Sequence, residues 1–92
     1  MKQKLIVGNW KMNGSLAANA ALLQAIKQGL PADNKAGAAV AAPALYLAQV
    51  QAELAGSAIG VGAQDVSQHE QGAFTGEISA TMLKEFGVRY AL

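Results

Sequence analysis

The chain has 92 residues, a net charge of +1 from seven basic and six acidic side chains, and no cysteine. This length allows one domain, and the sparse charge provides neither a basic surface for nucleic acid nor a polybasic segment for a membrane. The lack of cysteine favours a cytoplasmic protein without disulfides. No run of about 18 apolar residues is present that could span a bilayer.

The first two expected elements are a strand and a helix. Residues 4–8, KLIVG, form a short apolar run with a β-branched centre, which predicts a buried strand. A helix is expected over residues 16–28, with Ser15 at its N-cap position. The residues that recur at helical spacing in this segment are Leu16, Ala20, Leu23 and Ile26.

The same order then repeats. Residues 38–43, AAVAAP, predict a second strand, and Pro43 is expected in the first turn of the helix that follows. This helix presents Leu47, Val50 and Leu54 on one face and ends at Gly56.

A third strand is expected over residues 58–64, AIGVGAQ, and it is followed by a long segment without clear periodicity. Ser79 can cap a third helix, and VRYAL, residues 88–92, predicts a fourth strand. The apolar residues expected on the inner face of the third helix are Met82, Leu83 and Phe86.

The resulting β-α-β-α-β-α-β order predicts an α/β fold with parallel strands. Both the open doubly wound sheet and the (β/α)8 barrel use this unit, and both gather their chemistry at the carboxyl ends of the strands. Because the sequence stops within an apolar strand, we expect residues 1–92 to be part of a longer polypeptide.

Lys11 is the residue that most suggests chemistry. It lies in GNWKMNGS, directly after the first strand, and charged side chains rarely end buried strands without a partner. A lysine there can attract a small phosphorylated or carboxylated molecule. Asn9 is expected on the same side of the strand, where it could orient the ammonium, and Trp10 on the opposite side, where it packs.

The long segment offers weaker candidates. His69 is the only histidine, and we expect a surface side chain, because no cysteine or second histidine could complete a metal site. Asp65, Glu70 and Glu77 share this segment, but no spacing marks an acid–base pair, so solvated carboxylates are expected.

Three motifs, GNWKMNGS, GAQDVS and GAFTGEISATMLKEFGVRYAL, resemble the amino-terminal part of the triosephosphate isomerase family. The resemblance covers essentially the whole chain and implies that residues 1–92 are the amino-terminal portion of a single (β/α)8 barrel domain of about 250 residues, with no second domain. QDV departs slightly from the Gln-Asn pair that is commoner in the family.

The resemblance also implies an activity. The family interconverts dihydroxyacetone phosphate and glyceraldehyde 3-phosphate through an enediolate, in glycolysis and gluconeogenesis, without cofactor or metal. The family is itself a standard example of tuned ionisation in catalysis. Lys11 matches its catalytic, substrate-binding lysine, and Asn9 matches the neighbouring substrate-binding asparagine. The family's catalytic histidine and glutamate come later in the chain and His69 does not align with that histidine, so residues 1–92 alone are expected to be inactive.

The resemblance further implies a homodimer. In the family, the loop after the third strand, here residues 65–78, inserts beside the active site of the partner subunit. The resemblance places Phe74 and Thr75 at the tip of this loop, Gln64 at its base, and Met12 near the place where the partner's loop docks.

Two other hypotheses remain open. The chain could be a non-catalytic α/β module that binds a small anion at Asn9 and Lys11, or a part-barrel that serves folding or assembly. The sequence beyond Leu92 would separate the isomerase from the module, and the oligomer size would identify a part-barrel, since exposed strands should associate.

Overall fold

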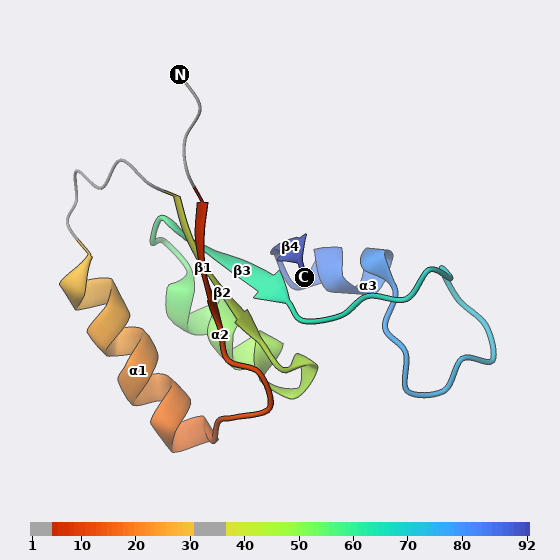
Figure 1. The fold of residues 1–92 in the computed structure, drawn as a ribbon, viewed down its shortest axis with the longest axis horizontal. Coiled ribbons are helices and arrows are strands. Elements are labelled where there is room, and N and C mark those ends of the chain that lie inside the picture. Colours follow the sequence, from red (N-terminus) through yellow and green to blue (C-terminus); the bar gives the residue numbers. More distant parts are fainter. Residues whose placement is uncertain (1–4, 31–36) are drawn as a thin grey trace.

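The computed structural model describes residues 5–30 and 37–92, so Lys4, the expected first residue of the first strand, lies outside the described residues. Strands and helices alternate as predicted (Figure 1). The four strands are parallel and form one sheet in the order β1-β2-β3-β4, which is not closed. The elements are β1 Leu5–Asn9, α1 Leu16–Gly29, β2 Gly37–Ala42, the 3-10 turn η1 Ala44–Tyr46, α2 Leu47–Leu54, β3 Ile59–Ala63, α3 Ala80–Glu85 and β4 Val88–Ala91.

The predicted helix caps are confirmed. The Ser15 hydroxyl accepts a hydrogen bond from the Ala18 backbone at 3.1 Å, and the Ser79 hydroxyl accepts one from Met82 at 3.2 Å. Each bond satisfies an N–H group that the first turn of a helix leaves unpaired. Pro43 was expected in the first turn of the second helix, and this prediction was wrong. Its backbone is still extended, with ψ at 144°, and the turn η1 separates it from the start of α2 at Leu47.

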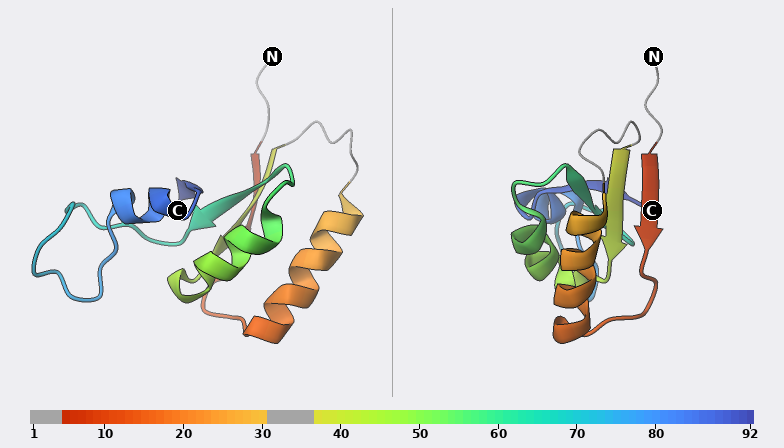
Figure 2. Two further views of the ribbon diagram at one scale, coloured as in Figure 1. Left: turned by 180° about the vertical axis from the view of Figure 1, so that it is seen from behind. Right: turned by 90° about the vertical axis from the view of Figure 1, so that its left-hand side faces the viewer.

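One face of the sheet packs against the helices (Figure 2). Leu23 of α1 and Val50 of α2 are completely buried, and they belong to the same cluster as Val40 and Val61, which are register partners in β2 and β3. Trp10 packs against this cluster, as predicted from its position opposite Asn9. The remaining buried members of the core are Ala42, Leu47, Leu54, Ile59, Ala63 and Leu83.

The other face of the sheet carries small residues. A Cβ atom on Gly60 would lie 2.9 Å from the ring of Tyr90 and 3.6 Å from the Cβ of Ala39. The Tyr90 side chain of β4 therefore lies over β3 on the side away from the helices, and only glycine leaves it enough space.

Three of the residues expected in helical core stripes are exposed, namely Leu16, Met82 and Phe86. Leu16 is the first residue of α1. The helix α3 has only six residues, so Leu83 is its one buried apolar side chain and Phe86 already belongs to the C-cap. Of the expected stripes in α1 and α3, only Leu23 and Leu83 are buried, so the helical periodicity assigned too many residues to the core.

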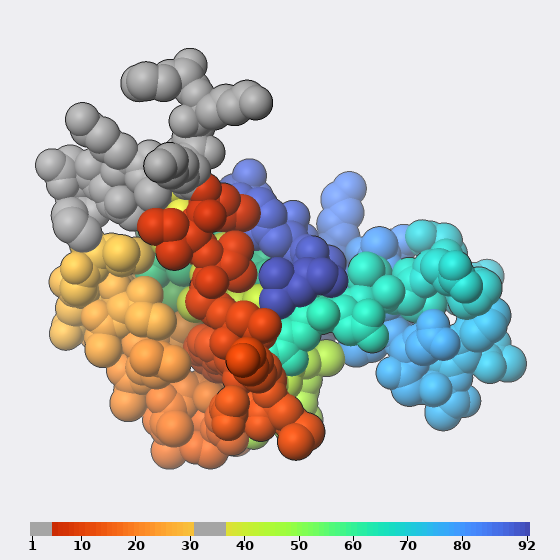
Figure 3. All heavy atoms as spheres, in the orientation of Figure 1, coloured from red at the N-terminus to blue at the C-terminus, as the bar shows by residue number. Residues whose placement is uncertain are grey.

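The segment between β3 and α3 projects from the body of the molecule (Figures 1 and 3). It leaves the carboxyl end of β3 and returns to Ser79, and the backbone N–H of Ser67 closes its base by donating to the carbonyl of Ile78 at 2.8 Å. Across residues 5–30 and 37–92, no helix has the length and apolarity needed to cross a bilayer.

Candidate active site

Lys11 lies two residues beyond β1, at the carboxyl edge of the sheet, and its side chain is exposed. Its φ is +55°, and among the described residues other than glycine it alone has a positive φ. A left-handed conformation costs an ordinary residue roughly 1–2 kcal/mol, so the surroundings must hold it in place. One such contact is local, because the Lys11 N–H donates to the side-chain oxygen of Asn9 at 2.9 Å.

A second contact comes from the end of β3. The side-chain nitrogen of Gln64 donates to the carbonyl of Lys11 at 2.7 Å. The same nitrogen lies 3.3 Å from the carbonyl of Ala41 and 3.4 Å from the side-chain oxygen of Asn9. Gln64 therefore connects the carboxyl ends of β1, β2 and β3 and holds the backbone of Lys11 from the side opposite to its N–H.

The sequence interpretation of Asn9 needs a correction. Strand alternation was expected to place Asn9 and Lys11 on one side, but β1 ends at Asn9, so alternation does not extend to Lys11. The two residues are brought together by a hydrogen bond instead, and Asn9 orients the backbone of Lys11 rather than its ammonium group.

A network of polar groups around the buried Asn19 supports the turn after Lys11. Asn19 is only 2% exposed although it lies in the apolar helix α1. Its oxygen accepts from the Ser15 N–H at 3.3 Å, and its nitrogen donates to Gln49 at 3.0 Å. The Tyr46 hydroxyl donates to the carbonyl of Gly14 at 3.2 Å. These contacts attach the segment between β1 and α1 to η1 and α2. The sequence analysis did not predict them, although an asparagine within an apolar helix could have indicated a buried polar contact.

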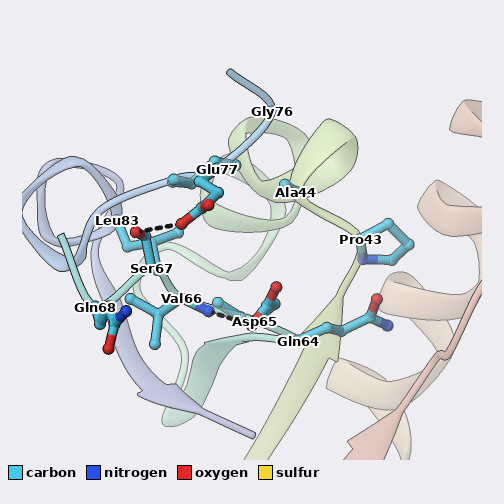
Figure 4. A pocket seen from close by; sticks show the side chains of 12 residues that line it. Pro43, Ala44, Gln64, Asp65, Val66, Ser67, Gln68, Gly76, Glu77 and Leu83 are labelled. Atoms are coloured by element: carbon cyan, nitrogen blue, oxygen red, sulfur yellow. Dashed lines mark hydrogen bonds between the residues drawn. The ribbon is translucent and has the colours of Figure 1, made fainter. Parts of the chain in front are cut away.

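A pocket of about 510 Å³ lies at the same edge, between the segments that follow β2 and β3 (Figure 4). The two carboxylates that line it are hydrogen-bonded to groups of the same loop. Asp65 accepts from the Val66 N–H at 2.9 Å, and Glu77 accepts from the Ser67 hydroxyl at 2.6 Å. Glu70 likewise accepts from the hydroxyl of Thr81. The three acidic residues are exposed, as expected for solvated carboxylates, and each accepts a hydrogen bond from a nearby group of the chain.

His69 lies on the loop between β3 and α3, which fits the expected surface side chain, but its ring is not free. It is partly buried, and its ring stacks on the ring of Phe74, with 3.8 Å between the ring centroids and 2° between the planes. Over the part of the chain that the structure describes, no three side chains are grouped as a metal site would require.

The residues expected at a subunit interface lie in the segments that follow β1 and β3, and they differ in exposure. Met12 is 95% exposed, Phe74 is 39% exposed, and Thr75 is also exposed, whereas Gln64 is half-buried. Leu45 of η1 is 81% exposed and was not anticipated. Met12 and Leu45 are thus the most exposed of the large apolar side chains in residues 5–30 and 37–92.

Comparison with known proteins identifies the family. The sequence model described as Triosephosphate isomerase matches residues 4–92. The triosephosphate isomerase of Delftia acidovorans is 75% identical over 92 residues, which are 100% of this chain and 37% of that protein. Those of Paracidovorax citrulli and Cupriavidus necator are 66% and 62% identical, over 99% and 100% of this chain and 37% and 36% of their own lengths. The chain spans little more than a third of these relatives, and it belongs to the triosephosphate isomerase family.

Proposed function

We propose that residues 1–92 are the amino-terminal part of an isomerase that interconverts dihydroxyacetone phosphate and glyceraldehyde 3-phosphate through an enediolate, in the cytoplasm. The observation that carries this proposal is the fixed position of Lys11, whose N–H is held by Asn9 and whose carbonyl is held by Gln64. This lysine lies at the carboxyl edge of a parallel sheet, where barrel enzymes bind their substrates.

In this proposal the Lys11 ammonium stabilises negative charge. The substrate phosphate is anionic, and further charge develops on an oxygen as the enediolate forms. A cation fixed in advance stabilises that charge without reorganisation during the reaction. Asn9 contributes to the substrate site and keeps the Lys11 backbone in its left-handed conformation.

The proposal is tested in the full-length polypeptide that carries this sequence. Lys11→Met should lower kcat/KM by about 100-fold or more, the usual scale for losing an electrostatic stabiliser. Lys84→Met removes an exposed lysine from the last turn of α3 and serves as the matched control, which should retain activity. Normal turnover by Lys11→Met would contradict the assignment.

The 92-residue chain by itself is proposed to be inactive. It contains one of the family's three catalytic side chains, and it covers 37% of the length of the Delftia acidovorans and Paracidovorax citrulli proteins. Purified chain at high concentration should show no isomerase activity. If it also bound inorganic phosphate at Lys11 with an affinity equal to that of the full-length protein, a binding module would be favoured over an enzyme fragment.

We also propose a homodimer through the loop of residues 65–78. Phe74 and Thr75 would enter the partner subunit, and Met12 would lie where the partner's loop docks. Gln64 would hold the base of the loop against the Lys11 segment, which would connect the interface to the active site. We include Leu45 in the proposed surface, because it is exposed and its neighbour Tyr46 is hydrogen-bonded to Gly14 in the same segment as Met12.

A further inference from the structure

The loop of residues 65–78 has an internal structure that its composition did not predict. It holds a stacked pair of rings, His69 and Phe74, whose centroids are 3.8 Å apart with an interplanar angle of 2°. The two residues come from opposite arms of the loop. Their stack therefore connects the outgoing arm of this projecting loop, which is seen in Figure 1, to the returning arm.

Gly72 makes this stack possible. Its φ is +133°, and a Cβ atom there would lie 2.9 Å from the Phe74 ring. The ring of Phe74 thus lies against the Gly72 backbone as well as against His69, and it remains 39% exposed. A free loop would gain by withdrawing such a ring from water, whereas here the ring is held in place with part of its surface outward.

A chain of hydrogen bonds connects the arms below the rings. The Ser67 hydroxyl accepts from the N–H of His69 at 3.0 Å and donates to the carboxylate of Glu77 at 2.6 Å (the second bond is drawn in Figure 4). The N–H of Glu77 in turn donates to the carbonyl of Phe74 at 3.0 Å. His69 and Phe74 are therefore connected in two ways: directly by the stacking of their rings, and indirectly by the hydrogen bonds through Ser67 and Glu77.

We infer that His69 is a positioning residue that fixes Phe74 in a docking conformation before a second copy of this chain binds. The inference rests on the proposed dimer, and it concerns the conformation of the 65–78 loop before the dimer forms. A long projecting loop would otherwise lose conformational freedom on association, and ordering it in advance reduces that loss. His69 acts through Phe74 and needs no contact of its own with the partner.

The test uses the full-length protein and three variants. His69→Ala should raise the dimer dissociation constant by roughly tenfold, the scale of one aromatic stacking contact, as measured by sedimentation equilibrium. His69→Phe keeps a ring at this position and should restore wild-type dimer affinity. Phe74→Ala should weaken the dimer at least as much as His69→Ala.

A spectroscopic measurement separates positioning from a general loss of structure. The stacked imidazole should shift the Phe74 ring protons upfield in the NMR spectrum, and His69→Ala should abolish that shift while the resonances of the helices stay unchanged. An unaltered Phe74 spectrum in His69→Ala would overturn the inference. A dimer weakened by Phe74→Ala but not by His69→Ala would overturn it and leave the proposed dimer intact, whereas no effect of Phe74→Ala would overturn the docking of the loop itself.

Discussion

The side-chain nitrogen of Gln64 donates to the backbone carbonyl of Lys11 at 2.7 Å, although 53 positions separate the two residues in the chain. This bond joins the end of β3 to the segment after β1. Together with the Asn9 contact to the Lys11 N–H, it holds both sides of a residue whose φ is +55°. The conformation of Lys11 therefore depends on a residue that belongs to the base of the 65–78 loop.

Under the proposed function, Gln64→Ala should consequently reduce catalysis rather than stability. Loss of the bond leaves the Lys11 carbonyl without this donor and releases its strained backbone, which should lower kcat/KM of the full-length enzyme by about tenfold. Gln24→Ala removes an exposed glutamine from α1 and serves as the control. Equal kinetics for the two variants would show that Gln64 does not position Lys11.

The turn between β1 and α1 requires glycine at position 14. Gly14 has a φ of +135°, and a Cβ there would lie 2.8 Å from the Asn19 oxygen and 3.0 Å from the Tyr46 ring. Gly14→Ala should lower the free energy of unfolding by roughly 1–3 kcal/mol in a denaturant titration. Gly29→Ala is the matched control, since no atom lies within 4 Å of its Cβ and alanine favours a helix; it should be neutral or stabilising by up to about 1 kcal/mol.

The element order and both serine caps could be predicted from the sequence, because periodicity and capping are local properties. The inner face of α2 was also predicted correctly, with Leu47, Val50 and Leu54 all buried. Leu16 and Met82 were misplaced because the apolar pattern alone does not show which apolar residues the sheet covers: Leu16 is the first residue of α1, and Met82 lies next to the buried Leu83.

The position of Lys11 at the strand ends could be predicted, but the contacts that hold it could not. The contacts of the Gln64 side chain reach the ends of β1 and β2 from β3, and they depend on how these three strands are aligned. A local sequence pattern does not encode that alignment. The stack of His69 on Phe74 was missed for a related reason: the rings meet only because Gly72 bends the loop at a φ that a sequence does not display.

Asn19 gives a further prediction. Asn19→Ala would remove the partner of the Ser15 N–H and of the Gln49 oxygen from two partly buried hydrogen bonds, a loss of about 1–3 kcal/mol in total. Unfolding free energy should fall by an amount in this range, and hydrogen exchange at the Ser15 amide should accelerate. The control Gln28→Ala alters an exposed position of α1 and should change neither quantity. A protected Ser15 amide in Asn19→Ala would contradict the proposed network.

The short helix α3 provides a direct comparison of two neighbouring apolar residues. Leu83 is buried in the core, whereas Met82 beside it is exposed. Leu83→Ala removes contacts with the sheet and leaves a cavity, so it should lower the free energy of unfolding by about 2–5 kcal/mol. Met82→Ala should cost less than about 1 kcal/mol in the same denaturant titration, since its side chain already contacts water. Similar losses for the two variants would mean that α3 packs on the sheet through a different face. The orientation of α3 described above, with Leu83 toward the core, would then be contradicted.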